Sequence, residues 1–247
     1  MRVRERWKLL LPGALLAATL GGCPLRPPVP AAPPPGTLPE QPAPHAGAPY
    51  DVVPEVSLLV IRVYRGGTLA SAGHNHVIAS HDLGGSIYVP ADILRSSFEL
   101  HVPVATLTID EAALRALEAS ADFPPDVSES AKEGTRRNLL GEALLDGEHN
   151  PEIVLRALSL AAADADTVLA RLQCTVRGQA HTLTVPVHYE RVNGTLTVSG
   201  ATVLRQTDLG LTPFSAMLGA LQVQDEMRVS FHIEARAARV LNALPSR

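Results

Sequence analysis

The sequence of 247 residues predicts a mainly β fold of about eight antiparallel strands with helical insertions. Two observations predict this fold class. After Val56, apolar residues alternate with polar ones in segment after segment, which is typical of strands that bury one face. Glycine, proline and asparagine stand between these segments, as they do at turns. About eight such strands close into a barrel or fold into a sandwich, and the pattern alone leaves both architectures open.

The expected strands follow one another along the whole second part of the chain. In chain order they contain Leu59 to Val63, Ser86 to Val89, Phe98 to Val104, Ile153 to Ala157, Val168 to Val176, Leu183 to Tyr189, Leu196 to Val198 and Met227 to Ile233. Asn193-Gly194 predicts a two-residue hairpin turn, because a type I′ turn needs positive φ at both positions. The last strand has the clearest alternation, since Val229, Phe231 and Ile233 share one face.

Two interruptions of this pattern indicate helices. Asp110 is expected to cap a helix over Glu111 to Ala121, and the spacing of Ser130 and Glu133 is that of a capping box ahead of a second apolar stretch. A further helix is expected over Thr212 to Leu221, entered through Pro213.

The N-terminus predicts export. A basic segment, Arg2 to Lys8, precedes the apolar run Leu9 to Leu20, which is the order of a signal peptide. The run is shorter than the roughly 20 residues that a membrane-spanning helix needs. Leu20-Gly21-Gly22-Cys23 resembles the lipobox of bacterial lipoproteins, so residues 1–22 are expected to be cleaved and Cys23 to be acylated.

Residues 23–49 are expected to form a tether between the lipid and a folded domain of residues 50–240. Eleven prolines in residues 24–49 favour extended polyproline conformations and leave no apolar period for a core. The expected location is the periplasm, anchored to a membrane. Pro24 stands where an acidic retention residue would stand, which favours the outer membrane over the inner one.

Charge and cysteine content exclude two classes of protein. Removal of residues 1–22 leaves 17 basic and 24 acidic side chains, a formal charge of −7, so the basic surface of a nucleic-acid binder is absent. Cys174 is then the only cysteine besides the acylated Cys23, and no internal disulfide can form. Stability must come from a packed core.

Six segments, in this order, resemble the YceI-like lipid- or polyisoprenoid-binding domain family from Asp51 to Ala235. They are Asp51 to Ser57, Gly85 to Ile93, Leu145 to Ile153, Leu172 to Val187 with its Arg177-Gly178 turn, Thr207 to Leu211, and Val223 to Met227. The resemblance implies a lipocalin-like antiparallel barrel with helical insertions. It also implies that the interior holds a long isoprenoid or fatty chain, without a catalytic residue or a cofactor.

The expected lining of such a barrel is the set of inward-facing apolar residues. These are Leu59, Ile61, Val63, Phe98, Leu100, Val102, Ile153, Leu155, Leu183, Val185, Val187, Val229, Phe231 and Ile233. The same residues would also form an ordinary packed core, and the pattern does not distinguish a hollow barrel from a filled one. The expected partners are the lipid and the membrane at Cys23, and a homodimer is left open.

An alternative function rests on histidines. Gly73-His74-Asn75-His76 places two imidazoles two residues apart, and on a strand both would face the same side. With His81 they could bind zinc or copper, as in a metal-binding or metal-dependent periplasmic protein. No glutamate is placed as an evident base and no cysteine is near, so the sequence favours lipid binding without catalysis and without a metal.

Overall fold

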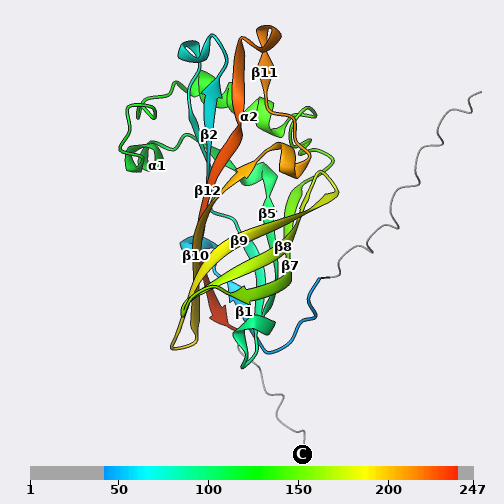
Figure 1. Cartoon of the computed structure of the whole chain (residues 1–247). Helices are drawn as coiled ribbons and strands as arrows, with labels where there is room; N and C mark the ends of the chain where they lie inside the picture. The colour runs from blue at the N-terminus through cyan, green and yellow to red at the C-terminus, as the bar shows by residue number, and fades with distance from the viewer. Residues whose placement is uncertain (1–41, 239–247) are drawn as a thin grey trace, which may run out of the picture. The chain divides into compact units, whose positions relative to one another are not determined.

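The computed structural model describes residues 42–238, and the expected signal peptide, Cys23 and most of the tether lie outside this range. Figure 1 shows the mainly β architecture. Eight antiparallel strands close into a barrel. Its strands, in spatial order, are β1 (Ala48–Val52), β4 (Gly84–Val89), β5 (Ser97–Pro103), β7 (Glu152–Ala162), β8 (Thr167–Val176), β9 (Gln179–Val192), β10 (Thr195–Arg205) and β12 (Leu221–Ala237). The ring is closed because β1 pairs with both β4 and β12. The expected fold class is confirmed, and the barrel rather than the sandwich is formed.

Two tight hairpins set the register of the central strands. Asn193 and Gly194 join β9 to β10 with φ values of 49° and 80°, as the sequence predicts. Arg177 and Gly178 join β8 to β9 with φ values of 51° and 69°. Two positive φ angles suit the right-handed twist of the paired strands. These turns therefore fix which residues of β8, β9 and β10 face the interior.

The long strand β12 carries a second group of strands beyond the closed ring. One edge of β12 pairs with β10, and the other pairs first with β2 (Leu58–Gly66) and then with β1. Next to β2 come β3 (His76–Ser80) and β6 (Thr108–Ile109). Figure 1 shows β12 running nearly the full height of the domain. The alternation did not predict β1, β3 or β6, which have at most five residues each.

The α-helices of the described residues lie between β6 and β7. They are α1 (Ala112–Leu117) and α2 (Glu129–Leu140). The capping residue of α2 is Ser128, whose hydroxyl accepts a hydrogen bond from the Ala131 N–H, and not the expected Ser130. Asp110 does not cap α1 either, because the N-cap position is Glu111 and the Asp110 carboxylate binds His76 and the Val77 N–H. None of the helices in residues 42–238 is long and apolar enough to span a membrane.

Within residues 42–238, six single turns of 3-10 helix connect the remaining elements. They are η1 (Pro54–Val56), η2 (Ala70–Ala72), η3 (Ile93–Arg95), η4 (Val104–Thr106), η5 (Thr207–Leu209) and η6 (Met217–Gly219).

The helix expected over Thr212 to Leu221 is wrong. The segment instead contains the short strand β11 (Ser215–Ala216), which pairs with the start of β12, and then η6. Met217 and Leu218 both have positive φ, so an α-helix cannot run through them. The side chains of both are exposed.

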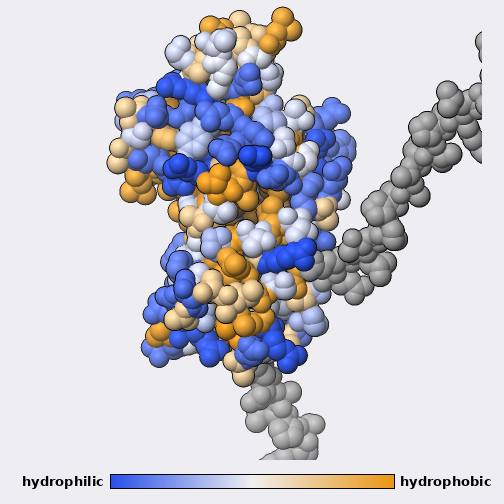
Figure 2. All heavy atoms as spheres, in the orientation of Figure 1, coloured by the Kyte–Doolittle hydropathy of each residue, from blue (hydrophilic) through white to orange (hydrophobic). Residues whose placement is uncertain are grey.

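Figure 2 shows apolar residues at the top of this view of the domain and a further apolar area near its middle.

Candidate functional site

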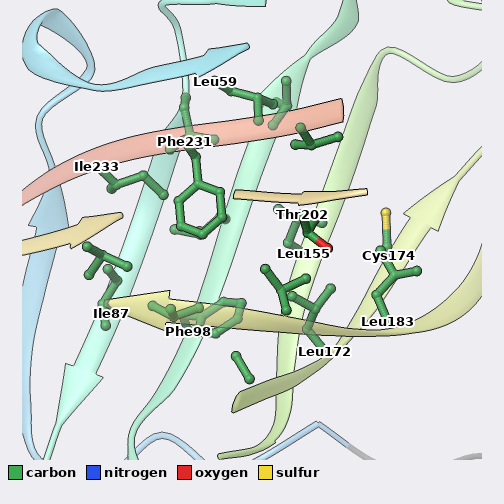
Figure 3. Close-up of a pocket in the computed structure, with 18 of the residues that line it drawn as sticks. Leu59, Ile87, Phe98, Leu155, Leu172, Cys174, Leu183, Thr202, Phe231 and Ile233 are labelled. Carbon is green, nitrogen blue, oxygen red and sulfur yellow. The ribbon is translucent and has the colours of Figure 1, made fainter. Parts of the chain in front are cut away.

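The first cavity lies between the strands of the ring and β2, and it has a volume of about 210 Å³. Alternate residues of the strands point into it, and Figure 3 shows Phe98, Leu155, Leu172, Leu183 and Phe231 converging from different strands. Its lining contains no charged side chain. Besides the Cys174 thiol, its polar side chains are those of Ser96, Tyr189 and Thr202. The wall is therefore suited to a hydrocarbon.

The structure brings together thirteen of the fourteen predicted lining residues around this first cavity. They are Leu59, Ile61, Phe98, Leu100, Val102, Ile153, Leu155, Leu183, Val185, Val187, Val229, Phe231 and Ile233. The remaining one, Val63, lines the neighbouring cavity instead. The prediction omitted the inward face of β8, which contributes Val168, Ala170, Leu172, Cys174 and Val176. The alternation of β8 in the sequence carries the signal that would have included them.

A second cavity of about 400 Å³ adjoins the first, because Ile61, Val102, Ile153 and Met227 line both. Its volume lies within the roughly 300–1,000 Å³ of ligand pockets. Its wall comes from β2, β3, β12, α2 and the loops near them, with one residue each from β5, β7 and β8. Most of the wall is apolar, with five exceptions. The polar side chains that line it are His74, His76, Thr135, Asn138 and Gln206.

Behind His76 lies a buried cluster centred on Asp110. One oxygen of its carboxylate, Oδ2, is 2.6 Å from His76 Nδ1. The other, Oδ1, accepts from the Val77 N–H at 2.9 Å and from Arg115 Nη1 at 2.6 Å. Arg115 also donates to the backbone carbonyl of Asn75 at 2.8 Å. Burial opposes ionisation of Asp110, but the hydrogen bonds from His76, Val77 and Arg115 outweigh it and lower the pKa of the carboxyl.

The structure does not bring His74, His76 and His81 together. The imidazole of His81 is paired through Nε2 with Glu111 Oε1 at 2.8 Å, whereas His76 is paired with Asp110. His76 and His81 are also five positions apart along an extended chain, roughly 17 Å. His74 precedes β3 instead of lying on it, and its ring centroid is 6.3 Å from that of His76. Within residues 42–238, no three His, Cys, Asp or Glu side chains are grouped so that they could hold a metal ion.

Cys174 lies on the inward face of β8 and lines the first cavity. Burial raises the pKa of its thiol to about 12. A thiol needs its anionic form to act as a nucleophile. Cys174 therefore serves as a small apolar wall residue, as its place on the apolar face predicts.

Comparisons with known proteins find a matching domain family and similar solved structures. A YceI-like domain model matches residues 65–235. The structure of BcnA from Burkholderia cenocepacia superimposes with a TM-score of 0.53 at 16% identity, covering 74% of this chain and 98% of that one. A polyisoprenoid-binding domain from Saccharophagus degradans, implicated in plant cell wall breakdown, gives 0.50 at 10% identity, covering 76% and 98%. No curated protein matches the sequence. The family match covers more than half of the residues, and the chain thus belongs to the YceI-like domain family.

Proposed function

We propose that the chain binds a long apolar lipid, with an isoprenoid or fatty chain, inside its barrel. The observation that carries this proposal is the first cavity, whose wall is hydrocarbon apart from a few uncharged polar groups. Each methylene buried there contributes roughly 0.8 kcal/mol, less the cost of immobilising a flexible chain. YceI-like domains are binding domains and generally non-catalytic, and one structural relative is described as a polyisoprenoid-binding domain. Both observations support lipid binding without a catalytic reaction.

The proposal includes a location. The sequence Leu20-Gly21-Gly22-Cys23 supports acylation of Cys23, and the Pro-rich residues 24–49 support a tether between the lipid anchor and the barrel. The domain would then work in the periplasm, close to the membrane from which it takes its ligand. Pro24 supports the outer membrane as the site of anchoring.

Native mass spectrometry of the full chain, released from detergent micelles in the gas phase, tests the binding proposal. We expect an added mass that fragments as an isoprenoid or fatty lipid, in about one copy per chain. A chain that carries no lipid from the cell, and takes up none when farnesol or palmitate is added, would contradict the proposal. Stoichiometric zinc or copper in the same spectrum would instead favour the metal-binding alternative.

A further inference from the structure

Two loops at one end of β12 expose apolar side chains together. One loop is residues 67–73, after β2, and the other is residues 212–220, which contain β11 and η6. The Leu69 N–H donates to the Ala220 carbonyl at 2.8 Å and so joins the loops, which we call the tip. Figure 1 shows β11 at the top of the view, where Figure 2 shows apolar residues. The large exposed apolar side chains of the tip are Leu69, Phe214, Met217 and Leu218.

The backbone of η6 holds Met217 and Leu218 in a strained conformation. Their φ values are 51° and 56°. This left-handed region crowds the β-carbon of every residue except glycine. The strain is not offset by burial, because the exposed fractions of the two side chains are 69% and 109%. Strained positions cluster at functional sites, and the tip therefore calls for a binding partner.

The tip carries no charged side chain. Residues 66–73 contain no lysine, arginine, aspartate, glutamate or histidine, and neither do residues 209–224. Charged side chains begin at one level below the tip, since Arg65 pairs across the strands with Val223 and Asp225 lies two positions beyond Val223. Contact surfaces between proteins have a polar rim, whereas a surface that enters hydrocarbon must be free of charge. The tip thus suits a lipid bilayer better than a protein.

The backbone of the tip already forms hydrogen bonds within the chain. The short strand β11 pairs with β12, and the Val223 N–H donates to the Phe214 carbonyl at 2.9 Å. In the other loop, the Ala72 N–H donates to the Leu69 carbonyl at 2.9 Å. Backbone groups without a partner are costly inside a bilayer. These hydrogen bonds reduce the cost of placing the tip there.

The second cavity reaches the surface beside the tip. Its wall includes Ala72, His74 and Phe214, and all three are exposed. The first cavity adjoins the second farther inside, because Ile61 and Met227 line both. A hydrocarbon chain that leaves a bilayer at the tip would meet the apolar wall of the second cavity and then that of the first.

The proposed lipid anchor is compatible with contact between the tip and the same membrane. Residues 24–41, which connect Cys23 to the described part of the chain, could span at most roughly 60 Å. Strand β12, with 17 residues, is about 56 Å long. The connection is therefore long enough for the tip to reach the membrane that holds Cys23.

We infer that the tip inserts into the surface of a lipid bilayer, and that the ligand passes between this bilayer and the second cavity. The inference rests on the proposed function and adds the route by which the lipid enters. Met217 and Leu218 enter the bilayer first, and Arg65 stays at the level of the head groups. The attraction is hydrophobic, so it should depend neither on anionic lipids nor on salt.

A single tryptophan at the tip tests the insertion. Trp7 is the only tryptophan in the sequence, so Trp7→Phe gives a full chain without indole fluorescence. This chain is reconstituted in vesicles of brominated phosphatidylcholine. We expect the emission of Leu218→Trp to shift to the blue and to be quenched by bromine.

The matched control is Val192→Trp, in the same Trp7→Phe chain. Val192 is exposed at 51%, like the residues of the tip. It lies near the opposite end of β12, because its partner Thr195 also pairs with Arg236. The emission of this variant should be neither shifted nor quenched.

Uptake of the ligand gives a second readout. Leu218→Asn removes the apolar side chain, and asparagine tolerates a positive φ, so the fold should be kept. We expect the variant to take up farnesol from phosphatidylcholine vesicles roughly three- to tenfold more slowly than the parent, since burying a leucine side chain is worth about tenfold or more. Its affinity for farnesol in detergent micelles should be unchanged. Native mass spectrometry follows both, and Val192→Thr should match the parent in both.

Four outcomes would overturn the inference. Bromine may not quench Leu218→Trp more than Val192→Trp is one form of failure that equal quenching of the two variants would reveal. The others are quenching that requires phosphatidylglycerol, farnesol uptake by Leu218→Asn at the rate of the parent, and a blue shift of Leu218→Trp without quenching, which would show that a second copy of the chain covers the tip. In each case farnesol still binds in micelles, and the proposed function survives. A parent that binds no farnesol in micelles would contradict the proposed function, whereas the quenching is measured without farnesol and tests the tip alone.

Discussion

Arg115 Nη1 lies 2.6 Å from Asp110 Oδ1, and neither side chain has any exposed surface. The pair links α1 to β3, because Asp110 also forms hydrogen bonds with the His76 side chain and the Val77 N–H. Removing one member of a buried ion pair leaves the other charge buried without a partner. We therefore expect Arg115→Met to lower the free energy of unfolding by about 3–5 kcal/mol, measured by denaturant titration. The exposed Arg191→Met should stay within about 0.5 kcal/mol of the parent.

The same carboxylate predicts the response of the fold to acid. The pKa of Asp110 is lower in the folded state than its ordinary value of 3.8. As the pH falls below that value, the unfolded chain takes up the proton first, so acid favours unfolding. The stabilisation from Asp110 is complete above its ordinary pKa and is lost as the pH falls through its folded pKa. The free energy of unfolding should thus fall less steeply below pH 4 in Asp110→Asn than in the parent, and parallel curves would contradict this.

Val229 tests whether the barrel is hollow. Its side chain lines the first cavity, so Val229→Phe should fill space that the lipid would occupy. We expect less co-purified lipid and little change in the melting temperature of the delipidated chain. In a packed core, the same change would cost about 1–3 kcal/mol by overpacking. The control is His232→Phe, because His232 is exposed on the opposite face of β12. Ser230, on the same face as His232, is unsuitable because its hydroxyl accepts a hydrogen bond from Arg62.

Cys174 should be unreactive in the folded protein. Burial raises the pKa of its thiol to about 12, so the thiolate is scarce at pH 8 and shielded from reagents. Iodoacetamide should modify Cys174 only after denaturation, as measured by mass spectrometry. The variant Ser159→Cys, at an exposed position of β7, should react at once. Labelling of Cys174 at the rate of that variant would show that the cavity wall opens.

Substitution of Cys23 tests whether the chain is anchored by a lipid. A fatty-acid analogue fed to the cells should label the parent and not Cys23→Ala. The number of free thiols gives an independent measure, since an acylated Cys23 leaves one thiol in the denatured chain, that of Cys174. Label in the alanine variant, or two free thiols in the parent, would show that the lipobox is not used.

The alternation of apolar residues predicted the barrel strands and their inward faces because a strand repeats every two residues. Phe98 and Phe231, far apart in sequence, were both assigned to the lining from this period alone, and both point into the first cavity. Short elements such as β6 contain too few residues for a period. The cavity inside the barrel could not be predicted, since inward apolar residues form the same pattern in a filled barrel.

The polar side chains that line the second cavity could not be predicted from local sequence patterns. Asp110 looks like a helix cap in the sequence, because an acidic residue precedes a helical stretch. Only the pairing of β3 with β6 brings Asp110 beside His76, across 34 positions. Thr135 reaches the same space because α2 packs near β6, across a further 25 residues. Tertiary structure, and not local sequence, brings His76 and Thr135 together in the wall of the second cavity.

The order of the strands along the chain has a consequence for biosynthesis. β12 follows all of its partners in the sequence, yet β10, β2 and β1 each need it to cover an edge. Until residues 221–237 have been synthesised, these edges stay unpaired and the interior is open to water. The apolar compartment therefore becomes sealed only when the latest-made strand takes its place. A chain without β12 therefore has no closed interior, even when every other strand of the wall is present.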